Sequence, residues 1–197
     1  MENILVVSGA EKGRIYFEDF LTSCKFGKVT AVCDAITAEE EFKGAQYDLC
    51  IINAPLPDGT GIELALYTVK QGFCQCMLVM AEDALANVKK EMEQAGVFVI
   101  AKPVKRDRLW IMLKNIAVVH NRLTSVRVEN ENLKHKLDDL QLVSRAKVLL
   151  ITNLKMSEPQ AHRFLEKQAM ERRMTKSDIA RRVIRTYEDN TFKGSES

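Results

Sequence analysis

The chain has 197 residues, of which 46% are hydrophobic and 28% charged, and its formal net charge is +2. This composition is ordinary for soluble proteins, and the length suits one large domain or two small domains joined by a connector. No apolar run approaches the roughly 20 residues that cross a bilayer, and no signal-peptide pattern opens the chain, so we expect a cytoplasmic protein without a membrane partner.

The cysteines and histidines give no indication of a metal site. The five cysteines are odd in number and lack a CxxC spacing, so we interpret them as reduced thiols in a core: Cys24, Cys33, Cys50, Cys74 and Cys76. The three histidines are scattered, and none has a partner at ligand spacing. Because no nucleophile–base pair stands out either, we predict no catalytic residues, no cofactor and no enzymatic activity.

The small net charge hides a strong asymmetry along the chain. Residues 1–105 carry 10 Lys/Arg against 15 Asp/Glu, and residues 106–140 carry 7 against 5. Residues 141–187 carry 11 against 4, which gives them a net charge of +7, whereas the last ten residues are acidic. An acidic front and a basic rear indicate that only the rear meets a polyanion.

The first hundred residues alternate short aliphatic runs with helical segments. We predict strands at 4–7, 29–33, 49–52, 77–80 and 97–101, and helices near 11–23, 37–45, 60–71 and 83–95. Thr37 and Glu40 have the spacing of a capping box at the start of the second helix. Strands without polar alternation that alternate with helices predict a parallel sheet covered on both faces, with any ligand site at the carboxyl ends of the strands.

Two segments of this region resemble the receiver domains of response regulators. The stretch from Tyr47 to Gly61, which contains the loop Leu-Pro-Asp-Gly-Thr-Gly, is similar to the third strand and following loop of that family. Lys102-Pro103 matches the family's Lys-Pro pair after the last strand. The resemblance covers about residues 2–105 and implies an α/β, flavodoxin-like (CheY-like) domain at 1–105 with a five-stranded parallel sheet.

The catalytic positions implied by this resemblance are mostly replaced. Asn53 stands for the phospho-acceptor Asp, Ser8 and Gly9 for the acidic pair, Met80 for the Ser/Thr and Val99 for the switch aromatic, while only Lys102 remains. Aspartyl phosphorylation needs a carboxylate nucleophile and Mg²⁺ held by anionic oxygens. We therefore predict a pseudo-receiver that is not phosphorylated. A degenerate site that binds an anion through Lys102 and loop amides stays open, as does a regulatory protein or ligand on this domain.

A long helix follows, because the chain has neither proline nor glycine between Pro103 and Pro159. We predict that it begins at 106 and ends near 154, with a coiled-coil segment at 106–144. Apolar residues recur at steps of three and four and define a dimer seam: Leu109, Met112, Ile116, Val119, Leu123, Val126, Asn130, Leu133, Leu137 and Leu140. Asn130 at a seam position favours a parallel two-stranded homodimer. The alternative is an amphipathic helix packed on its own domain.

The basic rear of the chain predicts a small helical module at 145–190, followed by a disordered tail at 191–197. The seam fails at Ser144 and Lys147, so the end of the long helix is expected to pack on two further helices. Ser157 with Gln160 and Thr175 with Asp178 have the spacing of helix N-terminal caps. Three helices of this size can enclose one small core.

The spaced residues of this module resemble an ANTAR domain. They are Arg145-Ala146-Lys147, Leu149-Leu150, Met156-Ser157-Glu158, Ala161, Leu165, Ala169-Met170 and Ile179-Ala180. That family is the RNA-binding output module of transcription antitermination regulators. The resemblance implies that the chain binds nascent mRNA at paired hairpins whose loops expose unstacked bases.

Candidate RNA contacts are the basic residues of this module: Arg145, Lys147, Arg163, Lys167, Arg172, Arg173, Lys176, Arg181, Arg182 and Arg185. We favour Arg172, Arg173 and Lys176 with Arg181 and Arg185. Aromatic residues are scarce and Phe164 is expected to be buried, so arginine planes are expected to stack on bases. Two alternatives stay open: a DNA-binding response regulator, and a dimer that binds only proteins.

Overall fold

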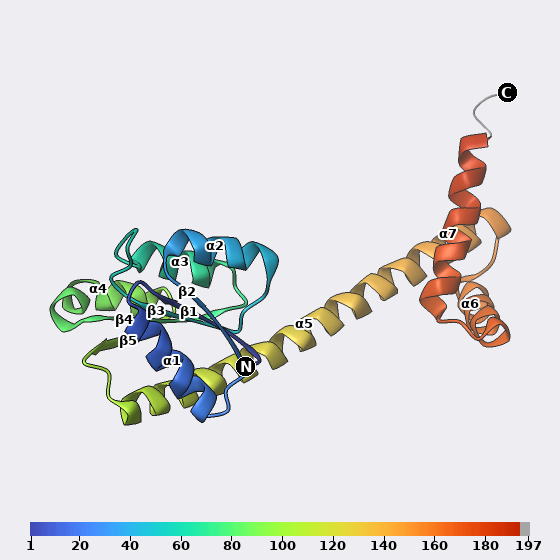
Figure 1. Cartoon of the computed structure of the whole chain (residues 1–197). Coiled ribbons are helices and arrows are strands. Elements are labelled where there is room, and N and C mark those ends of the chain that lie inside the picture. The colour runs from blue at the N-terminus through green and yellow to red at the C-terminus, as the bar shows by residue number, and fades with distance from the viewer. Residues whose placement is uncertain (194–197) are drawn as a thin grey trace. The chain divides into compact units, whose positions relative to one another are not determined.

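The computed structural model describes residues 1–193, with side chains up to Tyr187 (Figure 1). The chain divides into two compact units, Met1–Thr124 and Ser125–Ser197. One helix, α5 (Arg106–Leu154), contributes residues to both units. Its ends coincide with those predicted from the absence of proline and glycine.

The first unit is a five-stranded parallel sheet with strand order β2-β1-β3-β4-β5. Strands and helices alternate along the chain: β1 (Asn3–Ser8), α1 (Glu11–Ser23), β2 (Lys28–Val32), α2 (Ala35–Gly44), β3 (Leu49–Asn53), α3 (Ile62–Lys70), β4 (Gln75–Ala81), α4 (Glu82–Gln94) and β5 (Val97–Lys102). The predicted parallel-sheet fold is confirmed.

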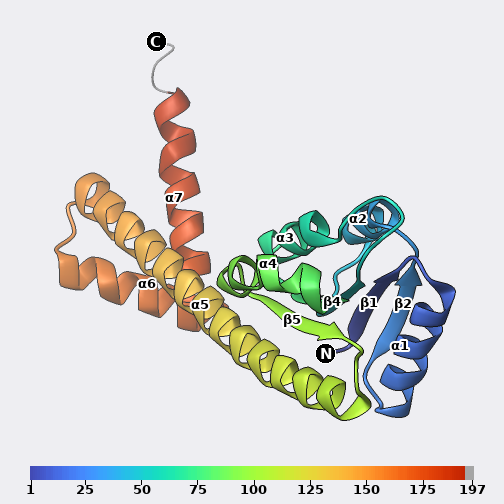
Figure 2. The ribbon, with the colours of Figure 1, turned by 90° about the vertical axis from the view of Figure 1, so that its left-hand side faces the viewer.

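Helices cover both faces of the sheet. Helices α2, α3 and α4 lie on one face, and α1 with the beginning of α5 lies on the other (Figure 2). Successive strand residues point to opposite faces, so Leu5 and Val7 join the first core while Ile4 and Val6 join the second. Burial on both sides explains why the strands read as unbroken aliphatic runs.

The capping box predicted at Thr37 and Glu40 is wrong. Helix α2 begins earlier, at Ala35, and its N-cap is Asp34, whose carboxylate accepts a hydrogen bond from the Thr37 backbone N–H at 2.8 Å. The Asp58 carboxylate accepts two further bonds from the Ala35 and Ile36 backbone N–H groups. Asp58 belongs to the loop after β3, so this loop residue satisfies donors that a helix start leaves unpaired.

The beginning of α5 packs on its own domain. Leu109 and Ile116, both predicted seam positions, are fully buried in the core that α1 shares, and Leu113 lies between them. Met112 is partly buried against the same core. Because these side chains already pack within the unit, a dimer seam can begin only at Val119. The first three turns of α5 therefore match the alternative interpretation, an amphipathic helix packed on its own domain.

Two cysteines depart from the prediction of core thiols. Cys33 is exposed and Cys24 is only partly buried, whereas the other three lie in the core. Burial raises the pKa of the Cys50 thiol to about 12. Within residues 1–193, no helix is long and apolar enough to cross a membrane.

The second unit contains the end of α5 together with α6 (Glu158–Arg172) and α7 (Lys176–Lys193). Its core is built from small and branched residues of all three helices: Ala146, Leu150, Ala161, Leu165, Ala169, Ile179, Ala180 and Ile184. The four alanines allow the helices to approach closely. Helix α7 continues three residues beyond the predicted end of the module at 190, and residues 194–197 of the predicted tail lie outside the described residues.

The predicted N-terminal caps of the last two helices are both present. Ser157 forms a capping box with Gln160, in which the Ser157 backbone N–H donates to the Gln160 side chain at 2.8 Å. The Thr175 hydroxyl accepts from the Asp178 backbone N–H at 3.1 Å and donates to the Asp178 carboxylate at 2.7 Å. These bonds fix where α6 and α7 begin.

Candidate nucleic-acid interface

The side chains of Ser8 and Asn53 form a hydrogen bond with each other at the carboxyl ends of β1 and β3. The two residues are register partners on neighbouring strands, and Asn53 Nδ2 donates to Ser8 Oγ at 2.9 Å. Ser8 Oγ donates in turn to the Ala10 carbonyl at 3.1 Å, and Ser8 is fully buried. These two side chains, which the sequence predicts to replace acidic residues of a receiver site, therefore form a neutral hydrogen-bonded pair.

Helix α1 packs directly over this pair. A Cβ atom placed on Gly13 would lie 2.5 Å from both Asn53 Nδ2 and Ser8 Oγ, closer than side-chain carbons come to such atoms. The neighbouring Arg14 guanidinium donates to the Ser8 carbonyl at 2.7 Å and to the Gly9 carbonyl at 3.3 Å. The positively charged Arg14 guanidinium thus lies at the end of β1. Between Gly13 and the Asn53 amide there is no space for a further side-chain atom.

The other predicted positions of this site are spread over the same domain. Lys102 Nζ donates to the Ala54 carbonyl at 2.5 Å, and burial lowers the pKa of Lys102. Met80 is buried in the core, and Val99 is half-buried in the middle of β5. Lys102 therefore lies near Asn53, as predicted, but its hydrogen bond goes to the loop backbone.

In the second unit, the predicted RNA contacts lie on all three helices. Helix α5 carries Arg145 and Lys147, helix α6 carries Arg163, Lys167 and Arg172, the following turn holds Arg173, and α7 carries Lys176, Arg181, Arg182 and Arg185. All are exposed except Lys147, which is half-buried. Arg173 ends α6 in the left-handed conformation, with φ 52°.

Ion pairs within the described part of the second unit involve several of these ten residues. Four of them pair with carboxylates of the same unit: Lys147 with Glu158 at 2.8 Å, Lys176 with Glu166 at 2.5 Å, Arg181 with Asp178 at 3.5 Å and Lys167 with Glu171 at 3.8 Å. The hydrogen bonds from Lys147 and Lys176 lower the pKa of their partner carboxyls. Lys176 and Arg181, two of the five favoured contacts, therefore carry compensated charge.

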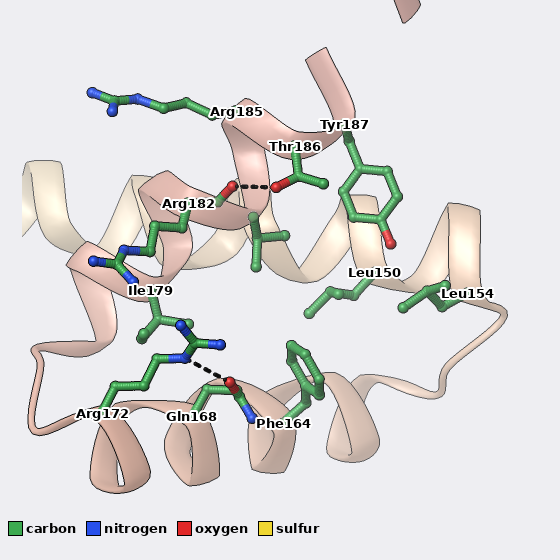
Figure 3. Close-up of a pocket in the computed structure, with 11 residues that line it drawn as sticks. Leu150, Leu154, Phe164, Gln168, Arg172, Ile179, Arg182, Arg185, Thr186 and Tyr187 are labelled. Carbon is green, nitrogen blue, oxygen red and sulfur yellow. Dashed lines mark hydrogen bonds between the residues drawn. The ribbon is translucent and has the colours of Figure 1, made fainter. Parts of the chain in front are cut away.

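A cavity of about 530 Å³ opens between the end of α5, α6 and α7. Its walls are mainly apolar and aromatic, with Leu150 and Leu154 from α5, Phe164 from α6, and Ile179, Val183 and Tyr187 from α7 (Figure 3). Arg172, Arg182 and Arg185 also line it. Side chains from three helices that are distant in sequence thus form one concave site.

The positions of Phe164 and Tyr187 differ from the expectation that aromatic rings are buried or too scarce to contact a ligand. Phe164 is half-buried rather than buried, and its ring points into the cavity, where the Tyr187 ring also lies (Figure 3). The recurrence of Ile179, Val183 and Tyr187 at steps of four is the signal that places Tyr187 on the inner face of α7.

Arg172 is held in place within this cavity. Its Nε donates to Gln168 Oε1 at 3.0 Å, and Gln168 Nε2 donates to Glu171 at 3.0 Å. Of the five favoured contacts, Arg172 and Arg185 line the cavity, and Arg182, which is not among those five, lines it with them. The arrangement combines flat apolar surface with three cations, of which Arg172 is held by a hydrogen bond, and this suits a planar anionic ligand.

Comparisons with known proteins agree with two modules. The response regulator receiver domain model matches residues 4–114, and the ANTAR domain model matches residues 131–184. The transcriptional regulatory protein PdtaR of Mycobacterium tuberculosis is 26% identical over 139 residues, which cover 71% of this chain and 68% of that protein. The aligned region therefore covers most of both chains.

Solved structures resemble the first unit. The signal receiver domain of an HD domain-containing protein from Pseudomonas fluorescens is 20% identical, with a TM-score of 0.55, and the match covers 64% of this chain and 91% of that one. The non-phosphorylated HemR receiver domain from Leptospira biflexa is 24% identical, with a TM-score of 0.52 and coverage of 59% and 94%. At these identities the likeness concerns the fold alone.

Proposed function

We propose a function from one premise: the chain belongs to the response regulator receiver domain family, and its residues 131–184 match an ANTAR domain. The protein is a transcription regulator that binds RNA hairpins through the ANTAR helices and acts in antitermination. Neither matched family is an enzyme family, in agreement with the prediction from the sequence. PdtaR, the relative from Mycobacterium tuberculosis, is named as a transcriptional regulatory protein.

The observation that supports RNA binding best is an excess of positive charge beside exposed apolar surface in the second unit. Residues 141–187 carry a net charge of +7. Among the residues with described side chains, the four ion pairs leave out Arg172, Arg182 and Arg185, which share one cavity. RNA loops are read by stacking and by hydrogen bonds to base edges, while phosphate contacts fix the position of the RNA.

Antitermination follows from competition between RNA structures. A transcript segment held as a hairpin by the protein is not free to pair into a terminator hairpin, so the polymerase continues. The protein needs no chemistry for this step, only affinity for the folded loop. Its regulatory effect is therefore set by how much of the chain is in an RNA-binding state.

We propose that the first unit is a pseudo-receiver without phosphotransfer. Asn53 offers a neutral amide that is already bonded to Ser8, and a phosphoryl acceptor must be a carboxylate in this chemistry. The Arg14 guanidinium bonds the carbonyls at the end of β1, where the resemblance implies a pair of acidic metal ligands. Control of the protein then comes from a regulatory protein or ligand on this unit, or from dimerisation.

We propose a parallel homodimer through the exposed part of α5. Six apolar seam residues are between 37% and 67% exposed: Val119, Leu123, Val126, Leu133, Leu137 and Leu140. An apolar stripe of this length is unfavourable in water and stabilising when two copies bury it. Two RNA-binding modules in one dimer gain avidity for a transcript with two hairpins.

The experiment is a hairpin-RNA binding titration with the full chain at several salt concentrations. We expect Arg172→Ala/Arg173→Ala to weaken binding. The log–log salt slope should also flatten by about 0.7 to 0.9 for each phosphate interaction that the variant removes. Arg181→Ala is the matched control, because Asp178 already compensates that charge, and its effect on the slope should be smaller.

Competition in the same assay separates the alternatives. The proposal requires hairpin RNA to displace duplex DNA of equal length at fixed salt. Tighter binding to the duplex would instead support a DNA-binding regulator. Equal and weak binding to both, at the non-specific level, would support a dimer that binds only proteins.

A further inference from the structure

We infer that the cavity between α5, α6 and α7 receives one unstacked base of the RNA loop, with its phosphate held by the arginines of the rim. The inference rests on the proposed RNA binding and adds the place and the chemical form of recognition. It concerns a single face of the second unit, and every residue that forms the site comes from that unit.

The size and the walls of the cavity fit a nucleobase. Its volume, about 530 Å³, is within the range of roughly 300–1,000 Å³ typical of sites for small ligands. Leu150, Ile179 and Val183 give an apolar floor, and the rings of Phe164 and Tyr187 face the same space (Figure 3). A base that leaves its stack in solution regains a flat apolar partner here.

The charges at the rim fit the rest of the nucleotide. Arg172, Arg182 and Arg185 line the cavity, and among the residues with described side chains, up to Tyr187, none that lines it is acidic. The Arg172 Nε bond to Gln168 orients the guanidinium, so its terminal nitrogens are arranged in advance for a phosphate or a base edge. Guanidinium groups bind phosphate in this bidentate way more strongly than a point charge does.

This combination distinguishes a nucleotide from other occupants. An apolar helix of a second copy would cover the floor, but it would also remove three arginines from water without supplying negative charge, which is unfavourable. A free phosphate would bind the arginines but would leave the apolar walls of the cavity in contact with water. A nucleotide satisfies both parts at once, since a planar base and an anion are joined by one sugar.

The test uses the full chain and hairpins selected by it from a pool with a constant stem and a randomised loop. Each loop position of a selected hairpin is then replaced, one at a time, by an abasic nucleotide. We expect one position to matter most, with binding roughly 10- to 100-fold weaker without its base, as for the loss of one stacked base.

Variants at the aromatic wall then assign that base to the cavity. Tyr187→Leu should bind the intact hairpin as weakly as the wild type binds the abasic one, and it should no longer distinguish the two RNAs. Tyr187→Phe keeps the ring and should keep the discrimination. Phe164→Leu, which retains apolar volume on α6, gives a second and independent check. Circular dichroism melting curves establish that each variant is folded.

Val148→Ala is the matched control, because Val148 is an exposed apolar residue of α5 in the same unit that neither lines the cavity nor belongs to the predicted RNA contacts. This variant should still distinguish intact from abasic RNA. If no single abasic position matters, or if Tyr187→Leu and Phe164→Leu keep the wild-type discrimination, the inference is overturned while the proposed function stands. If no hairpin is enriched from the pool, the proposed function fails and the inference fails with it.

Discussion

At the scale of single residues, four residues at the carboxyl ends of β1 and β3 bear on whether the first unit can be phosphorylated. Asn53 and Ser8 are bonded to each other, Gly13 leaves no space above them, and Arg14 bonds the backbone at the end of β1. A receiver site needs a free carboxylate and a metal at this place. The proposed pseudo-receiver therefore rests on the neutral amide at position 53 together with the close packing of Gly13 and the Arg14 cation.

Replacing Asn53 by the aspartate of a receiver site is therefore not expected to restore phosphorylation. Asn53→Asp supplies a carboxylate, but Ser8 and Gly9 still offer no charge for Mg²⁺, and Arg14 still bonds the Ser8 and Gly9 carbonyls. Incubation with a small acyl-phosphate donor and Mg²⁺, followed by intact mass spectrometry, should show no phosphoryl adduct on the variant or on the wild type. An adduct on the wild-type chain would remove the pseudo-receiver from the account.

Gly13 gives a stability prediction at the same place. Gly13→Ala forces a methyl group to within 2.5 Å of Asn53 Nδ2 and Ser8 Oγ, and overpacking of this kind costs about 1–3 kcal/mol. Gly44→Ala is the matched control: Gly44 is the last residue of α2, a Cβ there meets nothing within 4 Å, and alanine in place of glycine at a compatible backbone position stabilises by about 0.4–1 kcal/mol. Urea unfolding curves of the two variants should therefore shift in opposite directions, and equal shifts would contradict this packing.

At the scale of elements, α5 shows what sequence spacing can and cannot decide. Steps of three and four residues predict an apolar face, and α5 is helical over all the residues that define it. The same steps serve a helix that packs on a sheet and a helix that packs on its copy. Leu109 and Ile116 pack on the sheet domain. Only the contacts in the folded unit show at which residue this packing ends.

The elements of the sheet were predicted more closely than its site. Burial on both faces makes each strand a continuous aliphatic run, which is visible in the sequence. By contrast, the bond between Ser8 and Asn53 joins residues 45 positions apart, and the cavity of the second unit needs side chains from three helices. Spacing within one element carries no information on such long-range partners.

Glu166 links two elements, because its carboxylate pairs with Lys176 across the turn between α6 and α7. The hydrogen bond from Lys176 lowers the Glu166 pKa below its ordinary value of 4.5. A lowered folded-state pKa means that the pair stabilises the unit above about pH 4.5 and that this contribution is lost as the pH falls through the lower folded-state value.

We therefore expect Glu166→Gln to lower the Tm at pH 7, with a difference from the wild type that shrinks as the pH falls below 4.5. Glu171→Gln is the control, because the Glu171 pair with Lys167 lies within α6 and links no other helix. Thermal melts followed by circular dichroism from pH 7 to about pH 3 provide the comparison. Glu166 also lies 3.2 Å from His162 within α6, so the decisive range is below pH 4.5, where a difference that does not shrink would contradict the assigned role of the Lys176 pair.

At the scale of the whole molecule, charge and exposed apolar surface are divided along the chain. The first 105 residues are acidic, residues 141–187 are strongly basic, and α5 presents its exposed seam residues from Val119 onward. We propose that this division corresponds to regulation by the first unit, dimerisation through α5 and RNA binding by the second unit. The central claim is that two chains joined along α5 bind a transcript with two hairpins together.

Sedimentation of the full chain, alone and with an RNA that carries two hairpins, tests this claim most directly. We predict a dimer that binds one such RNA, and a Leu133→Lys/Leu137→Lys variant that sediments as a monomer and binds the two-hairpin RNA no more tightly than a single hairpin. Val128→Lys changes an exposed apolar residue outside the seam and should leave the dimer intact. A monomeric wild-type chain, or a seam variant that keeps the full advantage for two hairpins, would contradict the account.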